Sequence, residues 1–217
     1  MSSVLDTLTS RLRSRKVFRE FADSTGLVYF GDVNAHSDDH HVIRGLTLSP
    51  RHVDHHYSIG SHNGYDVALT SRRLTFGQTQ SIQSEWLVLD INLKHSSGLP
   101  HVFIGANQHN EHFYAQLFMT FRHLHKAQLG TFEAYTPLFS ERYSLYGAPT
   151  QHIELERVFT NQITHAIGEH FLPFSIEIVE GHLYVYAEDQ HINVKLLQKM
   201  LRDGLWLSEY LDHTLAK

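Results

Sequence analysis

The chain of 217 residues contains no cysteine. This absence excludes disulfide bonds, thiolate nucleophiles, iron–sulfur clusters and cysteine-based zinc sites. The chain also lacks any run of about eighteen apolar residues, which a membrane-spanning helix needs. Its N-terminus lacks the uninterrupted apolar stretch of a signal peptide. The sequence therefore predicts a soluble, cytoplasmic protein.

Charged residues are few, at 19% of the chain, and acidic residues outnumber basic ones to give a formal net charge of -5. A general nucleic-acid-binding protein needs a basic face to displace counterions, so we expect no nucleic-acid partner. Hydrophobic residues make up 41% of the chain, enough to fill the core of one large or two small domains. Strand-like and helix-like segments are interspersed with few β–α–β crossovers, which predicts an α+β fold.

The first 26 residues differ from the rest in charge. They carry five basic and three acidic residues, and Leu5, Leu8 and Leu12 recur at helical spacing. This pattern predicts a basic amphipathic helix that ends near Ala22. Such a helix either packs on its own domain or lies on an anionic membrane surface. The candidate membrane or partner surface consists of Arg11, Arg13, Arg15, Lys16 and Arg19.

Residues 27–106 are predicted to form a mainly antiparallel, β-rich body. Asn63–Gly64 lies between two segments rich in β-forming residues, which is typical of a β-hairpin. Trp86–Leu93 is the clearest strand and is apolar enough to be central. A domain boundary would fall near Ala106–Asn110. One continuous domain is the alternative, because no low-complexity linker occurs there.

Residues 107–217 are predicted to alternate helices with β-hairpins. One helix is expected over Glu111–Leu129, where apolar residues trace one face, and a final helix begins at Asn193. Glu180–Gly181 joins a second hairpin, in which the alternation predicts that Glu177 faces solvent.

Histidine is abundant, with 19 residues in the chain. The densest group of histidines and aspartates occupies residues 36–56. If residues 52–56 are extended, His52, Asp54 and His56 share one face, and His40 could approach from the preceding loop. That arrangement would suit zinc or manganese. A solvated loop has the same composition, so we expect no cofactor and keep these four residues as the best metal candidates.

Elsewhere the sequence shows no recognisable ligand or catalytic pattern. His123 and His125 fall on the predicted helix and, two residues apart, face different sides of it. His109 and His112 at the start of that helix lack a third ligand. There is no Gly-rich phosphate loop, nucleophile elbow or zinc-protease motif. No catalytic residue is assigned.

Four segments together resemble an uncharacterised bacterial domain family. In chain order they are Arg19–Tyr29, Leu99–Val102, Tyr143–Tyr146 and Ile176–Tyr186. The resemblance implies an N-terminal helix, an antiparallel β-rich body and a C-terminal portion of mixed helices and strands. Many members of the family carry N-terminal transmembrane helices, which this sequence does not contain. The resemblance implies no activity and no catalytic residues.

Three functions follow as hypotheses. We predict a non-catalytic module that binds a protein partner or assembles with itself, with peripheral contact at the inner face of a membrane through residues 1–22. The alternative is a metal-dependent hydrolase in which an ion held by the cluster at 36–56 activates water. The third is a pH sensor, because histidines that charge between roughly pH 5 and 7 would turn the net charge positive.

Overall fold

The computed structural model describes residues 2–32, 45, 52–76, 82–95, 98–109, 111–127 and 136–215. The strands are β1 (Val28–Gly31), β2 (His52–His62), β3 (Tyr65–Phe76), β4 (Ile82–Asn92), β5 (Val102–Ala106), β6 (His125–Lys126), β7 (Tyr143–Gly147), β8 (Ser175–Val179) and β9 (His182–Glu188). The helices are α1 (Ser2–Thr25), α2 (Glu111–Leu117), α3 (Pro137–Arg142), α4 (His152–Val158), α5 (Asn161–His170) and α6 (Val194–Leu215), with 3-10 helices η1 (Phe118–Thr120) and η2 (Pro149–Gln151).

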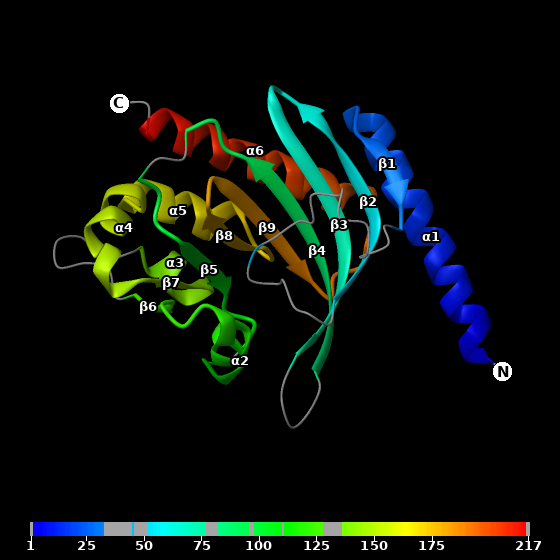
Figure 1. Cartoon of the computed structure of the whole chain (residues 1–217), viewed down its shortest axis with the longest axis horizontal. Helices are drawn as coiled ribbons and strands as arrows, with labels where there is room; N and C mark the ends of the chain where they lie inside the picture. The colour runs from blue at the N-terminus through cyan, green and yellow to red at the C-terminus, as the bar shows by residue number, and fades with distance from the viewer. Residues whose placement is uncertain are drawn as a thin grey trace.

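The described strands form one antiparallel sheet of nine strands, in the order β1-β2-β3-β4-β9-β8-β5-β7-β6 (Figure 1). With the N-terminal helix and the helices of the second half, this architecture confirms the predicted α+β fold. Strands of residues 27–106 and 107–217 share this one sheet, because β9 pairs with β4 and β5 lies between β8 and β7. None of the described helices has both the length and the apolar character needed to span a membrane.

Two hairpins form where the sequence supplies residues that tolerate a left-handed backbone. Asn63 and Gly64 join β2 to β3 with φ angles of 52° and 77°. Glu180 and Gly181 join β8 to β9 with φ angles of 50° and 84°. Two consecutive positive φ angles match the twist of antiparallel strands, so both predicted hairpins are confirmed.

Helices cover both faces of the sheet. On one face, α1, α3, α5 and α6 contribute to a large core, and α6 runs behind the strands in Figure 1. On the other face, α2 and η1 place Phe113 and Phe118 over Phe103 and Tyr146. The rings of Phe103 and Phe118 meet at 5.3 Å between centroids. The middle of the sheet is therefore buried from both sides.

Helix α6 approaches the sheet closely because one of its residues has no side chain. A Cβ atom on Gly204 would lie 2.9 Å from Ile91 Cδ1 and 3.2 Å from side-chain atoms of Leu89 and Val185. At the start of α6, Asn193 Oδ1 accepts a hydrogen bond of 3.0 Å from the backbone N–H of Leu196. This cap places the helix start at the position that the sequence predicts.

Two predicted helix ends are wrong. Helix α1 continues past Ala22 to Thr25, because the hydroxyls of Ser24 and Thr25 each donate a 2.8 Å hydrogen bond to the Phe21 carbonyl. These bonds keep both polar residues helical, and Gly26, with φ of 77°, ends the helix.

The helix expected over Glu111–Leu129 stops much earlier, at Leu117, and η1 follows it. His125 and Lys126 instead form β6, which pairs with β7. The N–H of Ala127 continues this pairing with a 2.8 Å bond to the Leu145 carbonyl. Backbone pairing with a strand remote in sequence thus prevails over the local helical periodicity.

The packing of α1 generates a stability prediction. Phe21 is completely buried, whereas Leu12 on the same helix is 65% exposed. We expect Phe21→Ala to lower the free energy of unfolding by about 3–5 kcal/mol, since it leaves a cavity in the core. Leu12→Ala should change it by less than about 0.5 kcal/mol. Urea unfolding of the two variants measures this difference, and equal losses would contradict the packing described.

Candidate functional site

The candidate partner surface lies on α1, whose described side chains have different surroundings along the helix. Phe18, Phe21 and Ala22 are fully buried against the sheet. Toward the N-terminus, the described side chains of residues 12–16 are exposed or half-buried. Figure 1 shows this end of α1 extending away from the rest of the fold. The side chain of Arg11 lies outside the described part of the chain.

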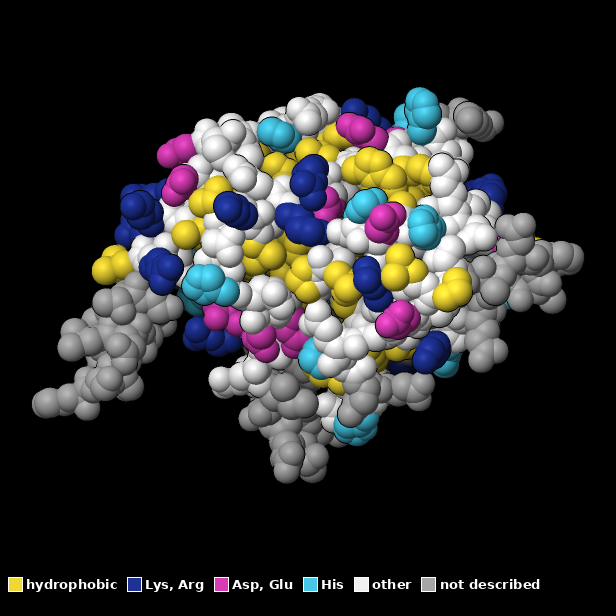
Figure 2. Space-filling model, turned by 180° about the vertical axis from the view of Figure 1, so that it is seen from behind, with side chains coloured by type: hydrophobic (Ala, Val, Ile, Leu, Met, Phe, Trp, Pro, Cys, Tyr) yellow, Lys and Arg dark blue, Asp and Glu magenta, His cyan; other side chains and the backbone are white. Residues whose placement is uncertain are grey.

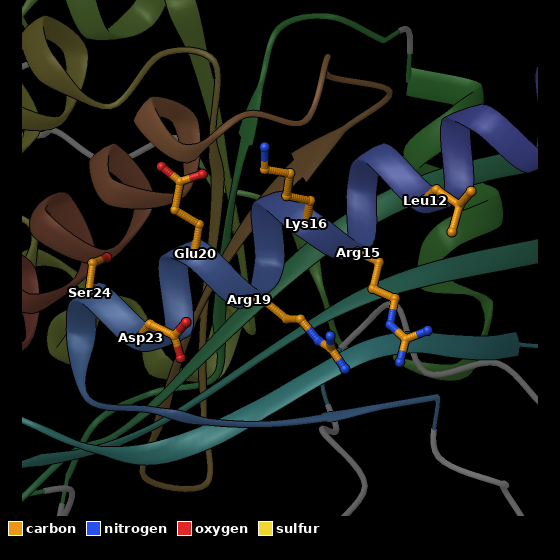
Figure 3. A pocket seen from close by; sticks show the side chains of 7 residues that line it. All are labelled: Leu12, Arg15, Lys16, Arg19, Glu20, Asp23 and Ser24. Carbon is orange, nitrogen blue, oxygen red and sulfur yellow. The ribbon is translucent and has the colours of Figure 1, made fainter.

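The basic side chains of Arg13, Arg15, Lys16 and Arg19 are all exposed. A shallow groove runs along α1 and is lined by Leu12, Arg15, Lys16, Arg19, Glu20, Asp23 and Ser24 (Figure 3). Arg15 and Arg19 point to one side of the helix, toward the strands, and Lys16 and Glu20 point to the other. Because every lining residue comes from one helix, this is an open surface. It suits an extended partner better than an enclosed small molecule.

The strand side of α1 carries an aromatic and imidazole cluster. The Arg19 guanidinium lies 5.4 Å from the centroid of the Tyr29 ring, within the range of a cation–π contact. The Tyr29 hydroxyl lies 2.8 Å from Nδ1 of His56, whose ring stacks on Phe18 at 4.8 Å between centroids. Burial lowers the pKa of His56, which favours the neutral imidazole.

The structure places the candidate metal ligands of β2 on different faces. His40 lies outside the described residues. His52 and Asp54 stand opposite Leu74 and Arg72 on β3, but a β-bulge between His55 and Ser58 interrupts the alternation. His56 adopts φ of 60° at this bulge and turns to α1 on the opposite face. No group of three histidine, aspartate or glutamate side chains in the described ranges converges as metal ligands.

Asp54 has a different role in the structure, because it pairs with a buried arginine. Its two carboxylate oxygens accept hydrogen bonds of 2.7 Å each from Nε and Nη2 of Arg72. Arg72 is completely buried. A bidentate carboxylate is a strong partner for a buried guanidinium, so Asp54 contributes to the stability of the fold.

A second polar network lies on the same face of the sheet. His123 Nε2 is 2.9 Å from His101 Nδ1, and His101 Nε2 is 2.8 Å from Glu177 Oε1. The other oxygen of Glu177 accepts a hydrogen bond from the Tyr186 hydroxyl. Burial and the neighbouring Glu177 hold the pKa of Tyr186 well above its usual value. Partial desolvation of the exposed His123, with a smaller effect of the charges of His101 and His125, lowers its pKa.

The position of Glu177 corrects the sequence prediction. It was expected to face solvent, yet it is completely buried. Gly45 lies directly over it, because a Cβ atom there would overlap the Tyr186 hydroxyl and approach Glu177 Oε2 to 2.8 Å. Glu154 and Glu156 lie on the helix α4. The alternation of apolar and polar residues shows which residues share a face of a strand. It does not show whether other elements bury one face or both.

His109 and His112 have separate partners. His109 hydrogen-bonds to Glu188, and its ring stacks on Phe113 at 3.6 Å between centroids. His112 Nε2 lies 3.0 Å from Gln116 Nε2 on the next turn of α2. The structure therefore gives these two histidines no common ligand position.

No protein-family model matches the chain, and no curated protein matches its sequence. Among solved structures, the chain is similar in fold to the crystal structure of the mycobacterial trehalose monomycolate transport factor A, TtfA. The TM-score is 0.63 at 12% sequence identity, and the match covers 91% of this chain and 94% of the chain in that crystal structure. At this identity the likeness shows a shared fold over nearly the whole length of both chains.

The Asp54–Arg72 pair generates a second stability prediction. Asp54→Ala should lower the free energy of unfolding by about 3–5 kcal/mol, because it removes the carboxylate that compensates a buried charge. Asp66→Ala, at an exposed position of β3, should change it by less than about 0.5 kcal/mol. Urea unfolding measures both variants, and a mild effect at Asp54 would contradict the structural role. If an Asp54 variant lost a hydrolase activity, unfolding would explain that loss as well as the removal of a metal ligand would.

His56 generates a prediction of pH dependence. Its pKa in the folded protein is lower than in the unfolded chain, where it is about 6.5. As the pH falls below that value, the unfolded chain takes up the proton first, so stability is lost toward acid. His56→Phe keeps a ring against Phe18 and should reduce the loss of unfolding free energy between pH 7.5 and about 5.5. His165→Phe, at an exposed position of α5, is the control, and the same pH profile in all three proteins would refute the prediction.

Proposed function

We propose that the protein is a non-catalytic interaction module that contacts its partner through the exposed basic residues of α1, Arg13, Arg15, Lys16 and Arg19. The observation that carries this proposal is the exposed, basic stretch of α1 beyond the buried Phe18–Ala22 anchor. Helix α1 has 24 residues. A helical stretch that lacks tertiary packing is marginally stable in water, so it gains stability when its face meets another surface.

Charge indicates the chemistry of that surface. The first 26 residues carry a surplus of basic residues in a chain whose net charge is -5. Figure 2 shows that basic and acidic side chains are mixed on the face of the molecule that α6 covers. Arg13, Arg15, Lys16 and Arg19 concentrate positive charge on one short helical segment. Such a segment attracts anionic lipid headgroups or an acidic protein face.

We place this contact in the cytoplasm, at the inner face of a membrane, with a protein partner or a second copy of the chain as the binding component. TtfA is described as a transport factor, and an accessory role of this kind agrees with that description. Membership of the uncharacterised bacterial family that the sequence resembles is part of the same proposal.

Vesicle flotation tests the proposal with matched charge reversals. Arg13→Glu/Lys16→Glu changes α1, and Arg157→Glu/Lys195→Glu makes the same change of charge at exposed positions on α4 and α6. We expect the natural protein to float with vesicles containing phosphatidylglycerol and to stay behind with pure phosphatidylcholine. The α1 variant should bind at least about tenfold more weakly, since each basic residue near an anionic surface contributes about 1 kcal/mol.

The control variant should bind as the natural protein does. Equal weakening in both variants would show a general charge effect and would contradict a specific role of α1. Sedimentation of the same proteins tests self-association. The proposal fails if the natural protein neither binds vesicles nor associates. Substitutions are preferable to deleting residues 1–22, because that deletion also removes the buried Phe18 and Phe21.

A further inference from the structure

Two imidazoles from distant parts of the sequence meet at the surface near the start of β5. His101 follows Pro100, and His123 lies in the turn between η1 and β6. Nδ1 of His101 and Nε2 of His123 are 2.9 Å apart, with ring centroids 4.9 Å apart. His123 is exposed, whereas the side chain of His101 retains 12% exposure. One ring is thus held by the protein and the other is accessible to solvent.

The buried side of His101 determines its tautomer. Its Nε2 faces Glu177 Oε1 at 2.8 Å, and a carboxylate only accepts hydrogen bonds. Nε2 therefore carries the proton and donates it, which leaves a lone pair on Nδ1. Glu177 is itself held by the Tyr186 hydroxyl, and the Phe121 ring packs perpendicular to the His101 ring at 5.1 Å between centroids. The lone pair of His101 Nδ1 is consequently directed at His123.

The distance between the two nitrogens is close to that between ligands of one metal ion. Two imidazole nitrogens at about 2.0–2.1 Å from a tetrahedral ion lie roughly 3.3 Å apart. To admit an ion, the rings of His101 and His123 separate by a few tenths of an ångström and rotate so that both lone pairs point at one common position beside the line between the two nitrogens. When the ion binds, Nε2 of His123 loses its proton and offers its lone pair to the ion, and the proton moves to Nδ1 or to solvent. A carboxylate behind a ligating histidine is the usual arrangement in metalloproteins, because it orients the ring and raises its basicity.

We propose that His101 and His123 form a two-imidazole site for a divalent transition-metal ion, with Glu177 as the residue that positions His101. Imidazole ligands favour copper and zinc over magnesium, calcium and manganese. The described residues supply no third converging side chain, so water completes the coordination. This site is distinct from the β2 candidates and is independent of the surface on α1.

Metal titration of the full chain, purified without a histidine tag, tests the site. Isothermal titration with Zn²⁺ and electron paramagnetic resonance with Cu²⁺ should show one tightest class of site, with two nitrogen ligands on copper. The 19 histidines of the chain add weaker binding, so the comparison with variants is decisive. We expect His123→Ala to weaken the tightest class at least about tenfold. His165→Ala, an exposed histidine on α5, should leave it unchanged.

Glu177→Gln tests the positioning role. It should weaken binding about 10–100-fold without changing the number of sites, as other carboxylates behind histidine ligands do. Circular dichroism checks that this buried variant remains folded. If it unfolds, the nitrogen count on copper in the natural protein and in His123→Ala decides the question. Zinc binding that is equal in His123→Ala and the natural protein, or a single nitrogen on copper in the natural protein, would overturn the proposal.

Discussion

Burial of the sheet from both sides requires that every charged side chain on its α2-covered face has a partner. Arg72 meets this requirement through Asp54, and Glu177 meets it through His101 and Tyr186. An unpaired buried charge destabilises the fold by more free energy than a formed ion pair contributes to it. These contacts therefore constrain how the strands are arranged. They also fix the orientation of the His101 ring at the surface. The same constraint thus stabilises the fold and prepares a metal ligand.

The pairing of these groups bears on which residues are available for function. Asp54 resembles a metal ligand in the sequence, but its two oxygens hold Arg72. The basic residues of α1 have a different position, because the buried Phe18 and Phe21 anchor the helix on the core while Arg13, Arg15, Lys16 and Arg19 are exposed. The anchor fixes where α1 lies on the sheet, and the exposed residues present the charge. The proposed interaction therefore depends on packing that the basic residues themselves do not provide.

The features that the sequence predicts well are local ones. Asn63–Gly64 needs only two residues that tolerate positive φ, and Asn193 caps the helix that follows it. The features that it misses depend on distant partners. Glu177 is buried because α2 and Gly45 cover the second face, and nothing within β8 indicates this. His101 and His123 meet because the predicted helix ends at Leu117 and the chain turns so that β6 pairs with β7. Their spacing of 22 residues therefore carries no motif.

The most direct test of the account is the tautomer of His101, measured from the ¹⁵N chemical shifts of its ring nitrogens in the metal-free protein. Pairing with the buried Glu177 predicts that the proton resides on Nε2 and exchanges slowly with water. It also predicts an unprotonated Nδ1 that faces His123. A proton on Nδ1, or an Nε2 proton that exchanges at the rate of a solvent-exposed imidazole, would show that the buried pair does not form and would contradict the account.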